Sequence, residues 1–541
     1  MPSALSYPGV YVEEVPSGVR TLTGVATSIT AFVGRAAAGP ANEPVMLTSF
    51  ADYERRFGGL AVDCPLSYAV RDFYLNGGTL ALVVRLVGTA ADPEAADAPA
   101  PASAATLTLP TGGDNLVLTA ASLGAWGGRL SAAVDYGTDS GLPAADTTRF
   151  NLRLRYRVRP GRDDFVFETI GAVSTTASDP RYLPLVLERE SALVRALGTV
   201  PAARPTSTVT PTTITWIDAA GGNDGPPLRA DDVLGNADAR TGIHALAHAD
   251  LFNLLVIPPL ARNTASLPST YTPVPANVWQ AALAMCVTRR AMLIVDPDPA
   301  WATPAASAVS NAQTGRTGLN LSGTGARNAA LYFPCLRMVD PLRDSRVDTF
   351  MPGGAVAGIM ARTDVARGVW KAPAGLDAAL NGVQDLQINL NDLQNGQLNP
   401  LGINCLRSMG VNGRVVWGAR TLRGADISAD EYKYVPVRRL ALFLEESLYR
   451  GTQWVVFEPN DEPLWAQVRL NLGAFMQGLF RQGAFQGATP RDAYFVKCDS
   501  QTTTQADINL GVLNVVVGFA PLKPAEFVVI KIQQMAGQIP T

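Results

Sequence analysis

The chain has 541 residues, of which 47% are apolar and 17% are charged, a composition typical of globular rather than disordered proteins. Its length predicts roughly three to four domains. The formal net charge of -3 excludes, for the chain as a whole, the strongly basic character of proteins that bind nucleic acid or anionic membranes.

The sequence contains no recognisable export signal or membrane span. The first residues, MPSALSYPGVYVEE, lack a basic start and an apolar core, and no run approaches the roughly 18 apolar residues of a membrane helix. We therefore expect a chain that is made and initially kept in the cytoplasm, without direct membrane insertion. The five cysteines are far apart and form no CxxC pair, which predicts buried, reduced packing residues.

Residues 1–20 are predicted to form an extended N-terminal linker strand. Pro8 and Pro16 bracket GVYVEEV, a strand-like run with no hairpin partner nearby. This run could be an edge strand of its own domain, or a strand donated to another subunit. Propensity alone favours the first alternative, because terminal strands usually pair within their own domain.

Residues 21–88 alternate between strand and helix patterns, which predicts the N-terminal part of an α/β core. Asn76-Gly77-Gly78 lies between a predicted helix and a predicted strand. A phosphate-binding loop needs the reverse order, in which a helix begins at the glycines. A simple turn is therefore predicted here.

Residues 89–213 are predicted to be an inserted β-rich domain, with flanking linkers rich in alanine, proline and threonine. In NLRLRYRVR, apolar residues alternate with Arg153, Arg155, Arg157 and Arg159, which places the four arginines on one strand face. Such a row could bind phosphates. Without interleaved aromatic residues, it is more often a solvated sheet face balanced by nearby acids.

The next two stretches return to alternating helices and strands. Residues 214–350 predict an α/β middle domain with a partly parallel sheet. Residues 351–520 are assigned to a C-terminal α/β core domain. Near its start, Gly353, Gly354 and Gly358 suit turns and the close approach of two backbones. The predicted fold class is thus mixed α/β, multidomain, with an inserted β-rich domain and extended strands at both ends.

Two amphipathic helices are predicted after residue 435. VPVRRLALFLEESLYRG places its apolar residues on one face and turns Arg438, Arg439, Glu445 and Glu446 away from it. NDEPLWAQVRLNLGAFMQGLFRQG begins with Asn460 or Asp461 as a helix cap and Pro463 in the first turn. Strand-like runs follow in AYFVKC, GVLNVVVGF and EFVVIKI, and the last belongs to a C-terminal linker strand, 521–541.

Catalytic motifs are missing from the sequence. Asp296 and Asp298 end a strand as metal-holding acids do, yet no GK dipeptide supplies a nucleotide loop, and capping of the next turn is favoured. His244 and His248 have an i, i+4 spacing that can ligate zinc, but without a third local ligand packing or surface roles are favoured. We therefore predict a protein that is not an enzyme, with no catalytic, metal or cofactor-binding residues and no cofactor.

Several stretches resemble the tail sheath proteins of contractile phages and related contractile injection systems. These include GVATSITAFVGRA, GPANEPVMLTSFADYERRFGG, MPGGAVAGIMARTDVARGVWKAPAGLDAALNGV, RRLALFLEESLYRGTQWVVFEPNDEPLWAQV, TPRDAYFVKCD and APLKPAEFVV. They follow one another in the family's order and cover the chain apart from the two linkers and much of the insertion, which would be the family's outward-facing domain.

The resemblance implies a structural subunit that polymerises helically around an inner tube and contracts from a metastable extended state to drive the tube through a target envelope. It also implies that the 9–15 and 526–533 strands reach into neighbouring subunits, which reverses the preference for the N-terminal strand given above. The strand-exchange residues would be Val10, Tyr11, Val12, Glu13, Phe527, Val528, Val529, Ile530, Lys531 and Ile532.

The resemblance further implies hinges at Pro16, Gly18, Pro521 and Pro524. The charged face of Arg438, Arg439, Glu445 and Glu446 is a candidate inner-tube contact, with a solvated helix face as its alternative. Implied partners are further copies of the chain, an inner tube protein, and baseplate and terminator or cap proteins, but not nucleic acid.

The implied location is the bacterial cytoplasm during assembly, and then a phage tail or a phage-tail-like particle, including one released from the cell. The type VI secretion sheath is split between two chains, whereas this chain contains both regions, which favours a phage or extracellular system. Two alternatives are a cytoplasmic α/β enzyme that uses Asp296 or His244, and a nucleic-acid scaffold that uses the arginine row.

Overall fold

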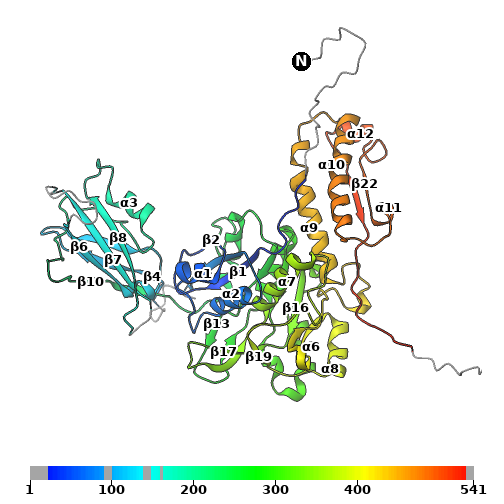
Figure 1. Ribbon diagram of the computed structural model, residues 1–541, viewed down its shortest axis with the longest axis horizontal. Helices are drawn as coiled ribbons and strands as arrows, with labels where there is room; N and C mark the ends of the chain where they lie inside the picture. Colours follow the sequence, from blue (N-terminus) through cyan, green and yellow to red (C-terminus); the bar gives the residue numbers. More distant parts are fainter. Residues whose placement is uncertain (1–21, 90–99, 138–145, 147, 159–161, 532–541) are drawn as a thin grey trace, which may run out of the picture. The chain divides into compact units, whose positions relative to one another are not determined.

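The computed structural model describes residues 22–89, 100–137, 146, 148–158 and 162–531 (Figure 1). The chain forms two compact units. The large unit comprises Ser28–Thr363 and Pro373–Lys433; of the described residues, the small unit comprises 22–27, Asp364–Ala372 and 434–531. This division differs from the predicted boundary at residue 351, because residues 403–416 supply strands to the sheet of the large unit.

A mixed eight-stranded sheet forms the centre of the large unit, which confirms the predicted α/β class and the partly parallel sheet. Its six inner strands are parallel, and an antiparallel strand lies at each edge. In spatial order the strands are β2 (Pro44–Leu47), β3 (Ala81–Leu86), β1 (Thr30–Arg35), β12 (Leu254–Val256), β15 (Met292–Val295), β16 (Ala329–Phe333), β20 (Ile403–Ser408) and β21 (Arg414–Val416).

Helices cover this sheet, so its inner strands are apolar on both faces, as expected for a parallel sheet. All residues of β3, β12, β15 and β16 are buried. The helices of the large unit outside the insertion are α1 (Phe50–Phe57), α2 (Pro65–Leu75), α4 (Ala230–Leu234), α5 (Ala276–Thr288), α6 (Ala308–Gly318), α7 (Gly353–Arg367, whose last residues group with the small unit) and α8 (Asp392–Leu398).

Helices α2 and α7 cross at close range because α7 carries glycines at the contact. A Cβ atom on Gly354 would lie 2.1 Å from the Ala69 carbonyl oxygen, and one on Gly358 would lie 2.4 Å from that of Phe73. The predicted close backbone approach is therefore confirmed at this crossing. The alternative, that these glycines form turns, is wrong because all three lie within α7.

Replacing Gly354 with alanine is expected to lower the free energy of unfolding by about 1–3 kcal/mol, because the new methyl group forces α7 away from α2. Gly396 in α8 provides the matched control, since a Cβ atom added there would have nothing within 4 Å of it. Alanine at this position should raise stability by about 0.5–1 kcal/mol through helix propensity. Urea unfolding of both variants measures the two effects. Equal effects on stability in the two variants would contradict the close contact between α2 and α7 at Gly354.

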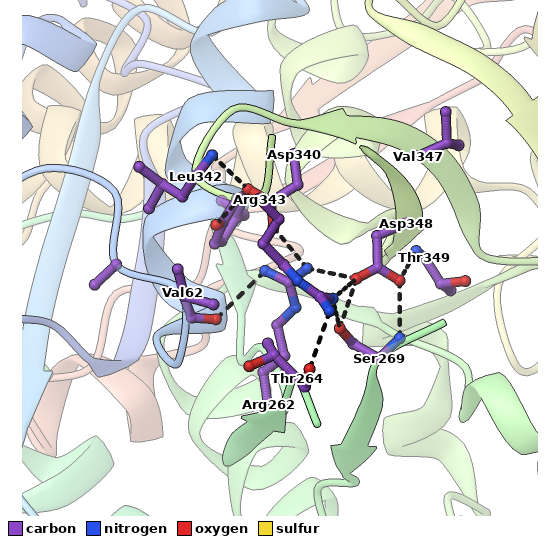
Figure 2. Close-up of polar contacts among 12 residues, drawn as sticks. Val62, Arg262, Thr264, Ser269, Asp340, Leu342, Arg343, Val347, Asp348 and Thr349 are labelled. Carbon is purple, nitrogen blue, oxygen red and sulfur yellow. Dashed lines mark hydrogen bonds and ion pairs between the residues drawn. The ribbon is translucent and has the colours of Figure 1, made fainter. Parts of the chain in front are cut away.

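A buried ionic network joins two small sheets of the large unit (Figure 2). The Arg262 guanidinium donates to Asp340 and Asp348 at 2.8 Å each, and all three side chains are fully buried. Arg343 and the Ser269 hydroxyl also bind Asp348. The strands involved are β13 (Ala261–Asn263), β14 (Thr270–Thr272), β17 (Leu336–Asp340), β18 (Arg346–Phe350) and β19 (Val383–Leu386). The network ties the β13–β14 hairpin to the β17–β18 hairpin.

The inserted stretch forms a β-sandwich. Its two four-stranded sheets have the orders β10–β6–β7–β8 and β11–β4–β5–β9. The elements are β4 (Ser103–Leu109), β5 (Leu116–Ala120), β6 (Leu130–Asp135), β7 (Arg149–Arg157), β8 (Phe165–Ser174), α3 (Leu183–Glu190), β9 (Val194–Arg195), β10 (Ile217–Asp218) and β11 (Ala220–Asn223). Leu152 and Leu154 point into its core, as the alternation predicts. The sandwich runs to Asn223, beyond the predicted end at residue 213.

The small unit contains two long helices and a two-stranded antiparallel sheet. Its elements are α9 (Val435–Gly451), α10 (Glu462–Arg481), α11 (Pro490–Ala493), β22 (Tyr494–Lys497), α12 (Gln505–Asn509) and β23 (Val516–Phe519), and Figure 1 shows α9 and α10 side by side.

Candidate assembly interface

Helices α9 and α10 form the frame of the small unit and confirm the two predicted helices. Leu440 and Leu444 of α9 pack with Met476 and Leu479 of α10 in one apolar cluster. Of the two cap candidates, Asp461 caps α10 by accepting from the Leu464 N–H at 3.3 Å. The connection between the helices contains a short 3-10 helix, Gln453–Val455.

Strands β22 and β23 confirm the two strand-like runs predicted after α10. They pair antiparallel over four residues, from Tyr494 opposite Phe519 to Lys497 opposite Val516. Within the described residues, each strand has one strand partner and therefore one unpaired edge. An unpaired edge presents backbone N–H and C=O groups to which another strand can add.

An apolar groove of about 820 Å³ lies along β23. Leu464, Val468 and Leu472 of α10 line it. Further lining comes from α9 (Leu448, Tyr449), the connection after α9 (Val455, Val456, Phe457) and the β23 region (Leu513, Val515, Val517), whereas no β22 residue lines it. The groove is therefore a place where an added strand could cover α10 and lie beside β23.

The described chain beyond β23 includes an apolar run, residues 527–530, which has no regular structure and no strand partner within the described residues. Phe527, Val528, Val529 and Ile530 are 75%, 81%, 79% and 78% exposed. Four consecutive apolar side chains at this exposure are unusual for a folded monomer and indicate a surface that becomes covered on association. The described part of the predicted closing strand is thus exposed and unpaired in the single chain.

The two predicted C-terminal hinges, Pro521 and Pro524, differ in whether they contact the region of the β22–β23 sheet. Pro521 still bridges to Phe485, and the Ala520 carbonyl accepts from the Gln486 N–H at 2.9 Å. Pro524 lies beyond these contacts, in chain without regular structure. Other predicted residues lie outside the described residues, namely Val10, Tyr11, Val12, Glu13, Pro16, Gly18 and Ile532.

The predicted charged face of α9 is wrong for two of its four members. Arg439 is buried and donates to Asp364 at 2.8 Å and to the Thr27 carbonyl at 2.9 Å. Glu446 is also buried and pairs with Arg450. Helical spacing could not place the Arg439 side chain, because its partners Asp364 and Thr27 are distant in sequence. The remaining members, Arg438 and Glu445, pair with each other at 3.1 Å.

The strand-end aspartates of β15 act as caps. Asp298 accepts from the Ala300 N–H at 2.8 Å, which confirms the predicted capping of the following turn. Asp296 is 6% exposed and accepts from the Gly353 N–H at the start of α7 at 2.7 Å. Burial raises the pKa of Asp296 from 3.8 to about 7.

Because the folded pKa of Asp296 is raised, the folded state binds more protons than the unfolded state between about pH 4 and 7, and stability falls as pH rises through this window. Asp296→Asn should therefore gain stability relative to the parent chain as pH rises, by up to a few kcal/mol at pH 8. Thermal unfolding at pH 4.5, 6 and 8 measures the difference. A difference independent of pH would contradict the assignment.

The histidine pair does not share a helix face. Residues Gly242–His248 form a 3-10 helix with about three residues per turn, so the i, i+4 spacing rotates His248 about 120° from His244. The structure thus removes the geometric reason for a zinc pair. The five cysteines are buried and reduced, as predicted. None of the helices in the described part of the chain has the length and apolar character of a membrane span.

Comparison with known proteins connects this geometry to a family. Residues 428–535 match the model of the phage tail sheath C-terminal domain. The tail sheath protein of Vibrio phage KVP40 is 28% identical over 127 residues, which is 23% of this chain but only 18% of the phage protein. The match to that relative is thus confined to a small part of its length.

Solved structures match over almost the full chain. A chain of the anti-feeding prophage baseplate has a TM-score of 0.55 at 22% identity and covers 98% of this chain and 99% of its own length. The PVC sheath complex of an extracellular contractile injection system, in its contracted state, has a TM-score of 0.55 at 20% identity and covers 99% of both chains. Residues 428–535 are therefore similar to the phage tail sheath C-terminal domain, and the chain shares its fold with proteins of contractile injection systems.

Proposed function

We propose that this chain is the structural subunit of a contractile sheath. Copies would polymerise helically around an inner tube and contract from a metastable extended state to drive the tube through a target envelope. The observation that carries the proposal is the combination of an exposed apolar run at 527–530 with an unpaired β23 edge and an apolar groove in the same unit, all within the described residues.

The run of one copy would bind in the groove of another. Within the described part of one chain the run has the properties of a donated strand, since it is apolar, exposed and unpaired. The groove has the receiver's properties, since Val515 and Val517 border it on the β23 side and apolar α10 residues line it. Strand addition satisfies backbone groups and places alternate side chains in the groove. The 9–15 strand is proposed to add to the second open edge, that of β22.

Such a mesh would allow subunits to move without separating. Each donated strand makes several backbone hydrogen bonds worth roughly 0.5–1.5 kcal/mol net. Hinges at Pro16, Gly18, Pro521 and Pro524 would take up the reorientation. Contraction then requires no fuel at the moment of firing, because assembly holds the packing of higher free energy.

The proposed partners are further copies of the chain, an inner tube protein, and baseplate and terminator proteins. Arg438 and Glu445 remain the candidate inner-tube contact on α9. We place assembly in the bacterial cytoplasm and the product in a phage tail or an extracellular injection particle. The relatives named above support sheath and baseplate association in this proposal.

Site-directed cross-linking tests the strand exchange. One batch of chain carries Val529→Cys, a second carries Val515→Cys, and the two are mixed under mild oxidation. We expect an intermolecular disulfide in the mixture, with little background because the native cysteines are buried. Val365→Cys replaces Val515→Cys as the control, since Val365 is exposed but does not line the groove. Equal cross-linking to positions 515 and 365 would refute the docking.

A further inference from the structure

The outer face of one sheet of the β-sandwich carries arginines and aromatic rings in alternation. We call Arg155, Arg157, Phe165, Phe167 and Trp216 the arginine–aromatic surface. The arginines come from β7, the phenylalanines from β8, and Trp216 directly precedes β10. Antiparallel register places Phe165 opposite Arg157 and Phe167 opposite Arg155. The sequence indicated a basic row without interleaved aromatic residues. In the fold, β8 and the residue before β10 place aromatic rings beside the arginines.

The guanidinium groups and the aromatic rings form one contiguous cluster. The Arg155 guanidinium lies 4.8 Å from the Phe165 ring centre and 4.3 Å from that of Trp216, and Arg157 lies 5.1 Å from Phe165. Phe167 lies 6.0 Å from Phe165 and 6.2 Å from Trp216. Rings that hold guanidinium groups in place fix their N–H edges for binding. Phe167, which contacts both Phe165 and Trp216, is 62% exposed, so much of its ring is open to solvent.

The charge on this face is modest. Arg153, next in the row, forms an ion pair with Asp135. In the part of the chain that the structure describes, neither Arg155 nor Arg157 forms an ion pair, although the Arg155 Nε–H donates to the Ser131 hydroxyl at 3.3 Å and that hydroxyl donates to Asp218 at 2.7 Å. The guanidinium of Arg157 and the terminal N–H groups of Arg155 are therefore available to a ligand, with acids nearby.

We propose that the arginine–aromatic surface binds a polysaccharide that carries carboxylate or phosphate groups. The apolar face of a sugar ring stacks on Phe167, because exposed aromatic rings gain most from covering a flat apolar surface. The anionic groups accept from the N–H edges of Arg157 and Arg155, where guanidinium geometry suits a carboxylate or phosphate.

Charge density favours a polysaccharide over nucleic acid. A nucleic acid strand carries a negative charge about every 3.4 Å, and its binding depends on neutralising many phosphates. This surface has two arginines that form no ion pair with a described carboxylate, and acidic residues lie nearby. Such a surface suits a polysaccharide whose negative charges are more widely spaced than those of nucleic acid. The proposal is independent of the sheath function, since it requires only the folded β-sandwich.

Retention of the full-length chain on immobilised polymers tests the proposal. The probes are carboxymethyl dextran of low substitution, unmodified dextran and a 20-residue deoxythymidine oligonucleotide. We expect retention on carboxymethyl dextran that weakens as salt increases, with little retention on dextran or the oligonucleotide. Stronger retention on the oligonucleotide would assign the surface to nucleic acid and overturn the proposal. Equal retention on both dextrans, or none on either, would overturn it as well.

Substitutions test whether retention on carboxymethyl dextran depends on the arginine–aromatic surface. Phe167→Ala and Arg157→Gln should each weaken binding to carboxymethyl dextran at least fivefold. Arg189→Gln on α3 is the matched control, since it removes the same charge from an exposed position away from the surface, and should bind as the parent does. Circular dichroism and the melting temperature show whether each variant is folded. Folded Phe167→Ala and Arg157→Gln variants that bind like the control would refute the assignment.

Discussion

Deletion of residues 524–541 is expected to abolish polymerisation while leaving a folded monomer. The deletion removes the four apolar side chains at 527–530, whose burial in a neighbouring groove is worth roughly 1.5 kcal/mol or more each. A loss of about 6 kcal/mol per contact corresponds to an affinity about 10⁴-fold weaker. Monomer stability should hardly change, because this run contributes no strand pairing within the described part of the chain. Sedimentation velocity and thermal unfolding measure the two properties.

A point substitution distinguishes the effect of lost strand pairing from the effect of deleting residues 524–541. Val529→Pro removes the backbone N–H of residue 529 from the donated strand. If this N–H forms a hydrogen bond to the receiving strand, the variant strand cannot pair fully. Val365→Ala, at an exposed position that does not line the groove, is the matched control and should polymerise normally. Normal polymers from the deleted chain would show that the C-terminal run is not the connecting element.

Replacing Arg262 with methionine is expected to lower the free energy of unfolding by about 3–5 kcal/mol. The change leaves the buried carboxylate of Asp340 without the cation that binds it and leaves Asp348 with Arg343 alone, and uncompensated buried charge is costly. It also removes the guanidinium from beside the Tyr68 and Phe350 rings, where it lies 4.9 and 4.8 Å from the ring centres. Urea unfolding, followed by tryptophan fluorescence, measures the loss.

Two comparisons make this prediction specific to the buried network. Arg346→Met changes an arginine of β18 whose side chain is 59% exposed and pairs with the still more exposed Asp344, so little change is expected. The triple variant Arg262→Met, Asp340→Asn, Asp348→Asn should recover part of the loss, because it removes the unpaired charges as well. Similar losses for Arg262→Met and Arg346→Met would contradict the account.

Elements with strong periodicity could be predicted from the sequence. The apolar spacing in 435–451 and 462–481 gave α9 and α10 because each helix buries one continuous face. The runs AYFVKC and GVLNVVVGF became β22 and β23. The alternation in β7 likewise placed Leu152 and Leu154 in the core.

Properties that depend on contacts between distant segments could not be predicted. Arg439 lies on the polar side of a helical pattern, and its burial is explained by Asp364, 75 residues away. The β7–β8 register places Phe165 and Phe167 beside the arginine row of β7. Trp216, tens of residues further along the chain, also contacts Arg155. The groove beside β23 is formed by α9, α10 and the chain before β23 together, and none of these segments predicts it alone.

Electron microscopy of the purified full-length chain at several concentrations tests the sheath proposal most directly. We predict long, hollow, striated tubes, which form alone or when inner tube and baseplate proteins are supplied. Discrete particles at every concentration, persisting when both partner proteins are present, would contradict the proposal that this chain is a polymerising sheath subunit.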